Sequence, residues 1–148
     1  MRCASLLVAV LLALPWSAQA QFVRLNDAVK YRQAAFQVLS THVQRAGAMA
    51  KGEVPFDKPA AETNAALIEM LSRQLATAFP PGSDMAPSKA KPEVWQEVAQ
   101  FKTHSDQWQS AAAKLSGAAR SGDANAFKTA FNALAQTCKS CHDSYRNR

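Results

Sequence analysis

The chain has 148 residues, and its 17 lysine and arginine residues outnumber its 11 aspartate and glutamate residues, which gives a formal net charge of +6 at pH 7. Such a surplus favours encounters with anionic partners. The basic residues are scattered, with no run and no patch interleaved with aromatic side chains, and this argues against a nucleic-acid-binding protein.

The first twenty residues have the pattern of a bacterial export signal. Arg2 gives a positive start, an apolar run of nine residues extends from Leu6 to Leu14, and small residues before position 21 form a cleavage site. The run is less than half of the about 20 residues needed to cross a bilayer, so we expect cleavage after Ala20 rather than a membrane anchor. The sequence therefore predicts a signal peptide at 1–20 and a periplasmic domain at 21–148, with no further segment apolar enough to cross a membrane.

Two helices are expected in the first half of that domain. The first should run over 27–50 with Asn26 as its N-cap, and the second should begin near Asp57, accept Pro59 in its first turn and end at the prolines 80–81. The apolar positions of the first helix recur every three or four residues if position 32 is included. That position is Arg32, which is costly to bury without a partner. Either the side chain snorkels to solvent, or a group between the helices supplies carboxylates to it.

Two more helices are expected after a proline-rich connection at 80–92. The third should start near Pro92 and end at Gly122, with Val98 on its buried stripe, and the fourth should start after Asp123 as N-cap. No alternating strand pattern is present. The fold class is therefore all-α, an antiparallel up-down-up-down four-helix bundle.

The last helix carries the motif with the most chemistry, Cys-Lys-Ser-Cys-His. Cys138 and Cys141 lie one helical turn apart on one face, His142 follows directly, and Cys3 is lost with the signal. A disulfide across two intervening residues closes almost no loop and would stabilise little. The spacing is typical of covalent attachment of one c-type haem per chain, in which two thioethers form and the adjacent histidine ligates iron.

Two other kinds of site can use a Cys-x-x-Cys pair. A thioredoxin-like dithiol lies at the start of a helix that follows a strand, where its thiol pKa is lowered, whereas this pair lies near a helix end. A zinc site needs four ligands in most cases, and His42 and His104 lack the usual paired spacing. Both fit less well than haem.

No residue stands out as a second axial ligand. His42 and Met49 lie off the main stripe of the first helix and are expected to be partly exposed, whereas Met70 is expected in the core. Met85 belongs to the proline-rich connection and His104 has polar neighbours. The sequence thus leaves the sixth coordination position without an evident ligand.

The chain resembles the cytochrome c′ family of class II c-type cytochromes over nearly all of residues 21–148. The resemblance rests on "DAVKYRQAAF", "KPEVWQEVAQFK" and "CKSCHDSYR". It implies that Cys138 and Cys141 form the thioethers, that His142 is the proximal iron ligand and that Arg32 contacts a haem propionate. It also implies that Arg146 lies beside the proximal imidazole, although a cation near a helix C-terminus is favoured by the helix dipole alone.

The resemblance also bears on function. Low-spin relatives place a methionine close to one turn after the arginine, where this chain has Phe36. This implies a five-coordinate, high-spin haem that binds NO and CO, and a homodimer formed through the first two helices. Two functions follow: an NO-binding protein that buffers or carries the gas, or a periplasmic electron carrier with a redox partner that the sequence does not identify. An enzyme is not expected, because no carboxylate or histidine is convincingly placed on the distal side.

Overall fold

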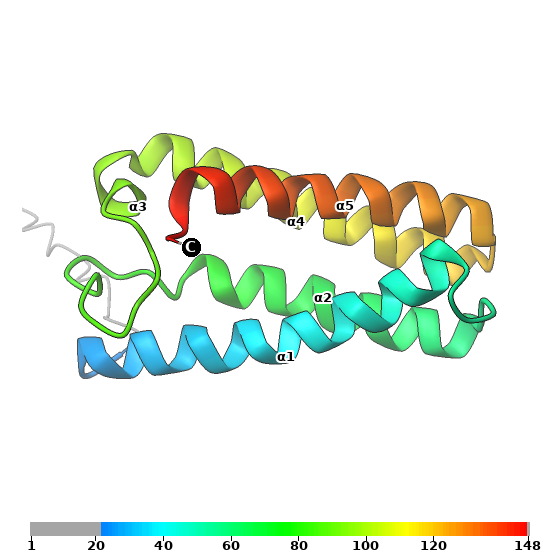
Figure 1. The fold of residues 1–148 in the computed structure, drawn as a ribbon, viewed down its shortest axis with the longest axis horizontal. Coiled ribbons are helices and arrows are strands. Elements are labelled where there is room, and N and C mark those ends of the chain that lie inside the picture. Colours follow the sequence, from blue (N-terminus) through cyan, green and yellow to red (C-terminus); the bar gives the residue numbers. More distant parts are fainter. Residues whose placement is uncertain (1–21, 148) are drawn as a thin grey trace, which may run out of the picture.

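The computed structural model describes residues 22–147, and the expected signal peptide lies outside them. The chain folds into the helices α1 (Leu25–Lys51), α2 (Lys58–Ala76), α3 (Glu93–Gln96), α4 (Val98–Ser121) and α5 (Ala124–Tyr145). The four long helices run alternately up and down in an antiparallel bundle, and α3 is a single turn at one end (Figure 1). The predicted all-α four-helix bundle is confirmed.

The helix ends follow the local sequence in most places. Asp57 caps α2 by accepting a hydrogen bond from the Ala60 amide at 2.7 Å, and Asp123 caps α5 by accepting from the Asn125 and Ala126 amides. The Asp123 cap was predicted, and the second helix was expected to begin near Asp57. The Asn26 cap was wrong, because α1 begins at Leu25 and Arg24 precedes it, paired with Asp27 at 2.8 Å.

The third predicted helix is interrupted. Glu97 leaves the helical conformation, with φ of −112° and ψ of 48°, and separates α3 from α4. Val98 is consequently 63% exposed instead of buried, so its predicted place on the apolar stripe was wrong. The second helix also ends earlier than expected, at Ala76.

The core lies between all four long helices, but α1 and α5 approach each other closely at one end only. There a Cβ atom added to Gly47 of α1 would lie 2.9 Å from Cζ of Phe131 on α5, so the glycine permits the close approach. Figure 1 shows the two helices separating toward the end where α5 finishes. The end at which they separate is the end that carries the Cys-Lys-Ser-Cys-His motif.

A long connection, 77–92, joins α2 to α3 and is tied to the end of α5. The Lys91 amide donates to the Tyr145 carbonyl at 2.9 Å, and the Asn147 amide donates to the Lys89 carbonyl at 2.8 Å. These bonds flank an antiparallel bridge between Ala90 and Arg146. Within residues 22–147, no helix has the combination of length and apolar composition that a membrane crossing requires.

Candidate haem site

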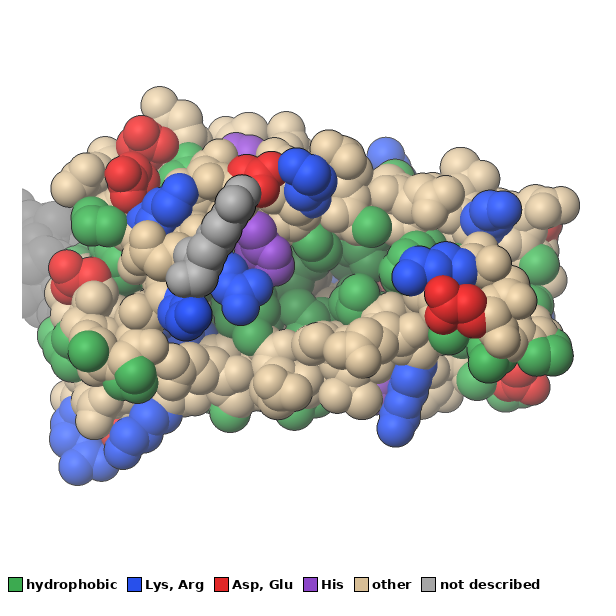
Figure 2. Space-filling model, in the orientation of Figure 1, with side chains coloured by type: hydrophobic (Ala, Val, Ile, Leu, Met, Phe, Trp, Pro, Cys, Tyr) green, Lys and Arg blue, Asp and Glu red, His purple; other side chains and the backbone are tan. Residues whose placement is uncertain are grey.

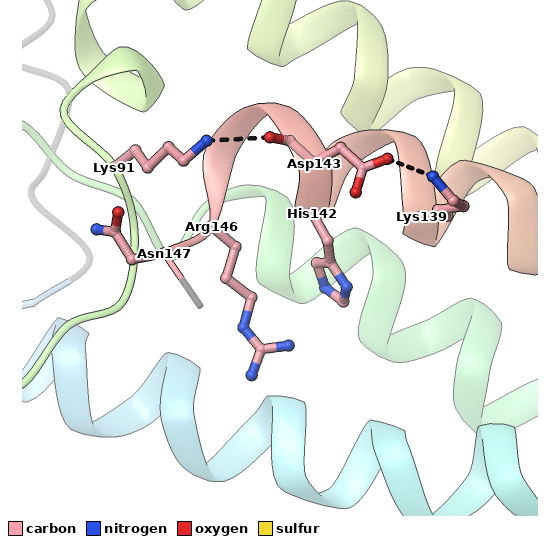
Figure 3. Close-up of a pocket in the computed structure, with 6 residues that line it drawn as sticks. All are labelled: Lys91, Lys139, His142, Asp143, Arg146 and Asn147. Carbon is pink, nitrogen blue, oxygen red and sulfur yellow. Dashed lines mark hydrogen bonds and ion pairs between the residues drawn. The ribbon is translucent and has the colours of Figure 1, made fainter.

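The three motif residues lie on the last two turns of α5. Cys138 and Cys141 are half-buried free thiols, and His142 reaches the surface. Figure 3 shows the side chains of His142 and Arg146 pointing from α5 toward α1. The helix end is held by Tyr145, which is buried and donates its hydroxyl to the Glu97 carboxylate at 3.2 Å.

The two thiols are in their protonated form at neutral pH. Burial raises the pKa of Cys138, and burial together with the neighbouring Cys138 raises the pKa of Cys141 to about 11. A dithiol used for exchange needs the opposite shift, which argues against the thioredoxin-like interpretation. The part of the chain that the structure describes also contains no group of three or more His, Cys, Asp or Glu side chains placed to hold a metal ion.

The imidazole of His142 is held in its neutral form. Desolvation lowers its pKa first, the charge of Arg146 lowers it further, and Asp143 opposes both effects. A neutral imidazole nitrogen is the form that ligates metals. The local electrostatics therefore suit an axial iron ligand.

Phe36 lies across the bundle from His142. It precedes Gly47 by eleven residues on α1, and His142 follows Phe131 by eleven residues on α5. The two helices are antiparallel and touch at the Gly47–Phe131 pair, so at 1.5 Å per residue both side chains lie at about the same level along the bundle. Phe36 is therefore the candidate of α1 for the side opposite His142, and that role stays a prediction.

A polar rim lies at the surface beside His142. A hollow of about 490 Å³ lies there, within the range of cofactor sites, and Figure 2 shows hydrophobic side chains in the hollow beside a histidine and basic residues. The residues that line the hollow at this rim are Lys91, Lys139, His142, Asp143, Arg146 and Asn147. A mostly cationic lining with apolar side chains beside it (Figure 2) suits a flat apolar group that carries carboxylates at one edge.

Aromatic side chains from two segments pack against Phe36. Its ring stacks on Trp108 of α4, with centroids 6.2 Å apart and planes 17° from parallel, and meets the edge of Phe79 at 6.5 Å. The Trp108 Nε1 atom is buried and has no hydrogen-bond partner among residues 22–147. The two thiols, the neutral imidazole, the gap between α1 and α5 and this unpaired donor together fit a haem group.

Arg32 is buried, with 3% of its surface exposed, so the snorkelling alternative was wrong. Its Nη1 donates to the Ser83 hydroxyl at 2.8 Å and to the Ala78 carbonyl at 3.3 Å, and its Nη2 donates to the Ser83 carbonyl and to the Ser88 hydroxyl at 2.7 Å. Desolvation lowers its pKa, and Asp84 opposes this. The side chain fastens 77–92 to α1, and its contact with a haem propionate stays a prediction.

The guanidinium of Arg32 also packs on aromatic rings. Its Cζ atom lies 5.0 Å from the centroid of Phe79 and 5.7 Å from that of Trp95, distances typical of cation–π contacts. Sequence reasoning missed Ser83, Ser88 and Trp95 as partners of Arg32. They lie about fifty or more positions away in the chain, and no local motif marks them.

The other candidate axial ligands are engaged elsewhere or were misplaced. His42 is half-buried, as expected, and its Nδ1 lies 2.9 Å from Oδ1 of Asn64. His104 lies 3.3 Å from the Ser140 hydroxyl, between α4 and α5. Met49 is buried instead of partly exposed, and Met70 is 47% exposed instead of in the core. Those two predictions were wrong, and Phe36 is the residue at the level of His142 on α1.

Comparison with known proteins agrees with this site. The family model described as Cytochrome C' matches residues 27–146. The chain is 40% identical to cytochrome c' of Rubrivivax gelatinosus over 129 residues, which is 86% of this chain and 100% of that protein. It is 37% identical to cytochrome c' of Alcaligenes xylosoxydans xylosoxydans, over 86% of this chain and 99% of the relative.

Solved structures are similar as well. The crystal structure of the Rubrivivax gelatinosus protein superposes with a TM-score of 0.83 at 41% identity, covering 86% of this chain and 100% of that one. A ferrous variant of cytochrome c prime from Alcaligenes xylosoxidans with bound NO has a TM-score of 0.81 at 35% identity, covering 86% and 99%. A further variant from that organism is carbon monoxide bound, with the same TM-score at 36% identity, covering 86% and 100%.

Proposed function

The chain belongs to the cytochrome c′ family, and we propose that it is a periplasmic protein whose five-coordinate haem binds NO, and also CO, in order to buffer or carry NO. Members of this family carry covalently bound haem c and bind gas ligands, and they are not enzymes. The two solved relatives with NO and with CO bound support a gas as the ligand.

One observation supports the proposal: Phe36 on α1 lies at about the level of His142 on α5. Its ring has no atom that can coordinate iron, so the position across from the proximal histidine is left to an external ligand. Haem, when bound, supplies the iron that takes up such a ligand reversibly. Phe36 and Phe79 keep water from that side, because both rings are apolar and lie in edge contact.

The residues of this chain have distinct roles in the proposal. Cys138 and Cys141 hold the group covalently, and His142 ligates the iron through its neutral ring. Arg32 contacts a propionate while it fastens the connection 77–92. Arg146 lies one turn beyond His142 and points the same way (Figure 3), so it places a positive charge beside the proximal imidazole.

A homodimer through α1 and α2 is part of the proposal. Val38 on α1 is 49% exposed and Met70 on α2 is 47% exposed, and such side chains suit an apolar contact between two copies. Sedimentation of the purified protein measures this directly. A monomer at all accessible concentrations would contradict the dimer without affecting haem binding.

Electron transfer is the second candidate, and the rim favours it. Lys91, Lys139 and Arg146 border the opening above His142, where positive charge would steer an acidic redox partner toward the haem edge. The alternative predicts reduction by such a partner at rates that fall as salt is added. A vacant sixth position argues against it as the main role, because ligand change during the redox cycle slows electron transfer.

The test combines mass spectrometry with optical spectra. The chain, expressed with haem-maturation machinery and recovered from the periplasm, should lack residues 1–20 and carry one covalent haem. The double variant Cys138→Ala/Cys141→Ala is the control and should carry none. Ferric and ferrous spectra should be high-spin and should change on addition of NO. An unmodified wild-type chain, or a six-coordinate low-spin spectrum without added ligand, would contradict the proposal.

A further inference from the structure

We propose that the indole N–H of Trp108 donates a hydrogen bond to the diatomic ligand bound on the Phe36 side of the haem. This inference rests on the proposed function, since it needs a ligand at that position. In the proposed function the apolar rings of Phe36 and Phe79 keep water from the ligand side. The N–H of Trp108 adds one polar group there. Trp108 would therefore decide how long a ligand is retained, separately from how easily it enters.

The first observation is the unpaired donor itself. Trp108 Nε1 is buried and has no hydrogen-bond partner in the described part of the chain. A buried N–H group without an acceptor is destabilising, and folded proteins pair nearly all such groups. The other described indole obeys that rule, because Trp95 Nε1 donates to the Phe79 carbonyl at 3.2 Å and to the Pro80 carbonyl at 3.0 Å. The missing acceptor of Trp108 is therefore expected in a group bound beside it.

The second observation is position. The indole ring of Trp108 stacks on Phe36, with centroids 6.2 Å apart, and Phe36 on α1 lies at about the level of His142 on α5. A ligand that binds opposite His142 must move the Phe36 ring, and it then occupies space against Trp108. The side chains around Trp108 in this place are aromatic or apolar and offer it no acceptor. The terminal atom of NO or CO is a hydrogen-bond acceptor.

The haem carboxylates are the other acceptors to consider. They would lie toward the polar opening, where the rim already provides Lys91 and Arg146 and where Arg32 is the predicted partner. Trp108 instead packs against the hydrophobic core. An acceptor on the iron-bound ligand thus fits its location better, and the experiment separates the two.

The expected effect follows from the chemistry of a donor at the terminal atom. Hydrogen bonding draws electron density from iron into the ligand, which weakens the bond between the two ligand atoms and strengthens the bond to iron. Replacing Trp108 by Phe keeps an aromatic ring against Phe36 and removes only the N–H. We expect the C–O stretching frequency to rise and CO dissociation to become about two- to tenfold faster, the range for one neutral hydrogen bond.

The experiment measures the C–O stretch and CO dissociation of the ferrous holoprotein for wild type, Trp108→Phe and the matched control Trp95→Phe, each in H₂O and D₂O. The wild-type stretch should shift on deuteration, the Trp108→Phe stretch should be higher and insensitive to deuteration, and Trp95→Phe should match wild type. Identical frequencies in all three proteins, without a deuterium effect in wild type, would overturn the inference. So would a deuterium effect confined to haem propionate vibrations.

The deuterium comparison on wild type alone decides the question if Trp108→Phe fails to retain haem. Failure of the proposed function has a different signature. In that case the wild-type ferrous spectrum does not change when CO is added, and no C–O stretch is observed. Binding with a normal spectral change but no role for the Trp108 N–H contradicts the inference only.

Discussion

Ser83→Ala tests how the connection 77–92 is fastened to α1. Ser83 is completely buried, and its hydroxyl accepts a hydrogen bond from Arg32 Nη1 at 2.8 Å while donating to the Pro80 carbonyl at 2.8 Å. Alanine removes both bonds and little volume. Nη1 of the buried guanidinium then keeps only the Ala78 carbonyl, at 3.3 Å, while Nη2 keeps the Ser83 carbonyl and the Ser88 hydroxyl.

The magnitude can be worked from these contacts. A hydrogen bond to a charged group contributes about 1.5–3 kcal/mol. The Pro80 carbonyl is not orphaned, because it still accepts from the Ser83 amide at 3.2 Å and from Trp95 Nε1 at 3.0 Å. We therefore expect the free energy of unfolding to fall by about 2 kcal/mol, which for a domain of this size lowers Tm by about 6–10 °C.

Ser88→Ala is the matched control. Ser88 is half-buried, and its partner Arg32 Nη2 keeps the Ser83 carbonyl as an acceptor, so water can replace the lost hydroxyl and the cost should stay below about 1 kcal/mol. Urea unfolding of the two variants and wild type measures both values. The reasoning would be refuted if Ser83→Ala lowered the free energy of unfolding by less than about 0.5 kcal/mol, or if both serine variants lowered it equally. Either result would show that the buried Arg32–Ser83 hydrogen bond does not fasten the connection 77–92.

Three further substitutions address the site and the helix contact that opens it. Phe36→Ala should tighten CO binding to the ferrous protein about tenfold, because the about 1.4 kcal/mol needed to displace the ring is no longer spent. It should also lower the free energy of unfolding by about 3 kcal/mol. CO titration and urea unfolding measure the two effects, and a CO affinity within twofold of wild type would show that Phe36 is an ordinary core residue. His142→Gly should keep the covalent haem but alter the ferrous spectrum, and an unaltered spectrum would show that another residue is the ligand. Gly47→Ala should lose stability in urea, because a Cβ 2.9 Å from Phe131 Cζ overpacks the contact by about 1–3 kcal/mol, more than the about 1 kcal/mol gained in helix propensity. Adding Phe131→Leu should restore part of that loss, and a stabilising Gly47→Ala would show that the two helices are not in tight contact.

Much of the fold follows from local pattern, as α5 illustrates. Asp123 caps the helix, and Phe127, Phe131 and Leu134 recur at helical spacing and are buried. The motif residues continue the same face, so their placement could be predicted as well. Local signals are sufficient here because α5 is a continuous helix with one buried side.

The wrong predictions concern residues whose burial depends on contacts between helices. Met49 was misplaced because α1 contacts both α2 and α5, so it buries a wider arc than a single stripe. Val98 was misplaced because the chain breaks at Glu97, whose carboxylate accepts from Tyr145 across the bundle at 3.2 Å. The partners of Arg32 and the unpaired N–H of Trp108 likewise depend on residues distant in sequence, which spacing rules do not reach.

The bonds between 77–92 and the end of α5 have a consequence for the order of folding. Lys89 and Asn147 are joined by a hydrogen bond although all of α3, α4 and α5 lies between them in sequence, so the chain must close a long loop before this contact forms. Contacts of that kind are slow to form, and backbone hydrogen bonds between exposed residues, as Lys89 and Asn147 are, are among the first to open in native-state fluctuations. We therefore expect amide hydrogen exchange at Lys91 and Asn147 to be faster than at the Gly47–Phe131 end. The surface opening of the site would then open transiently while α1 and α5 stay in contact at Gly47 and Phe131.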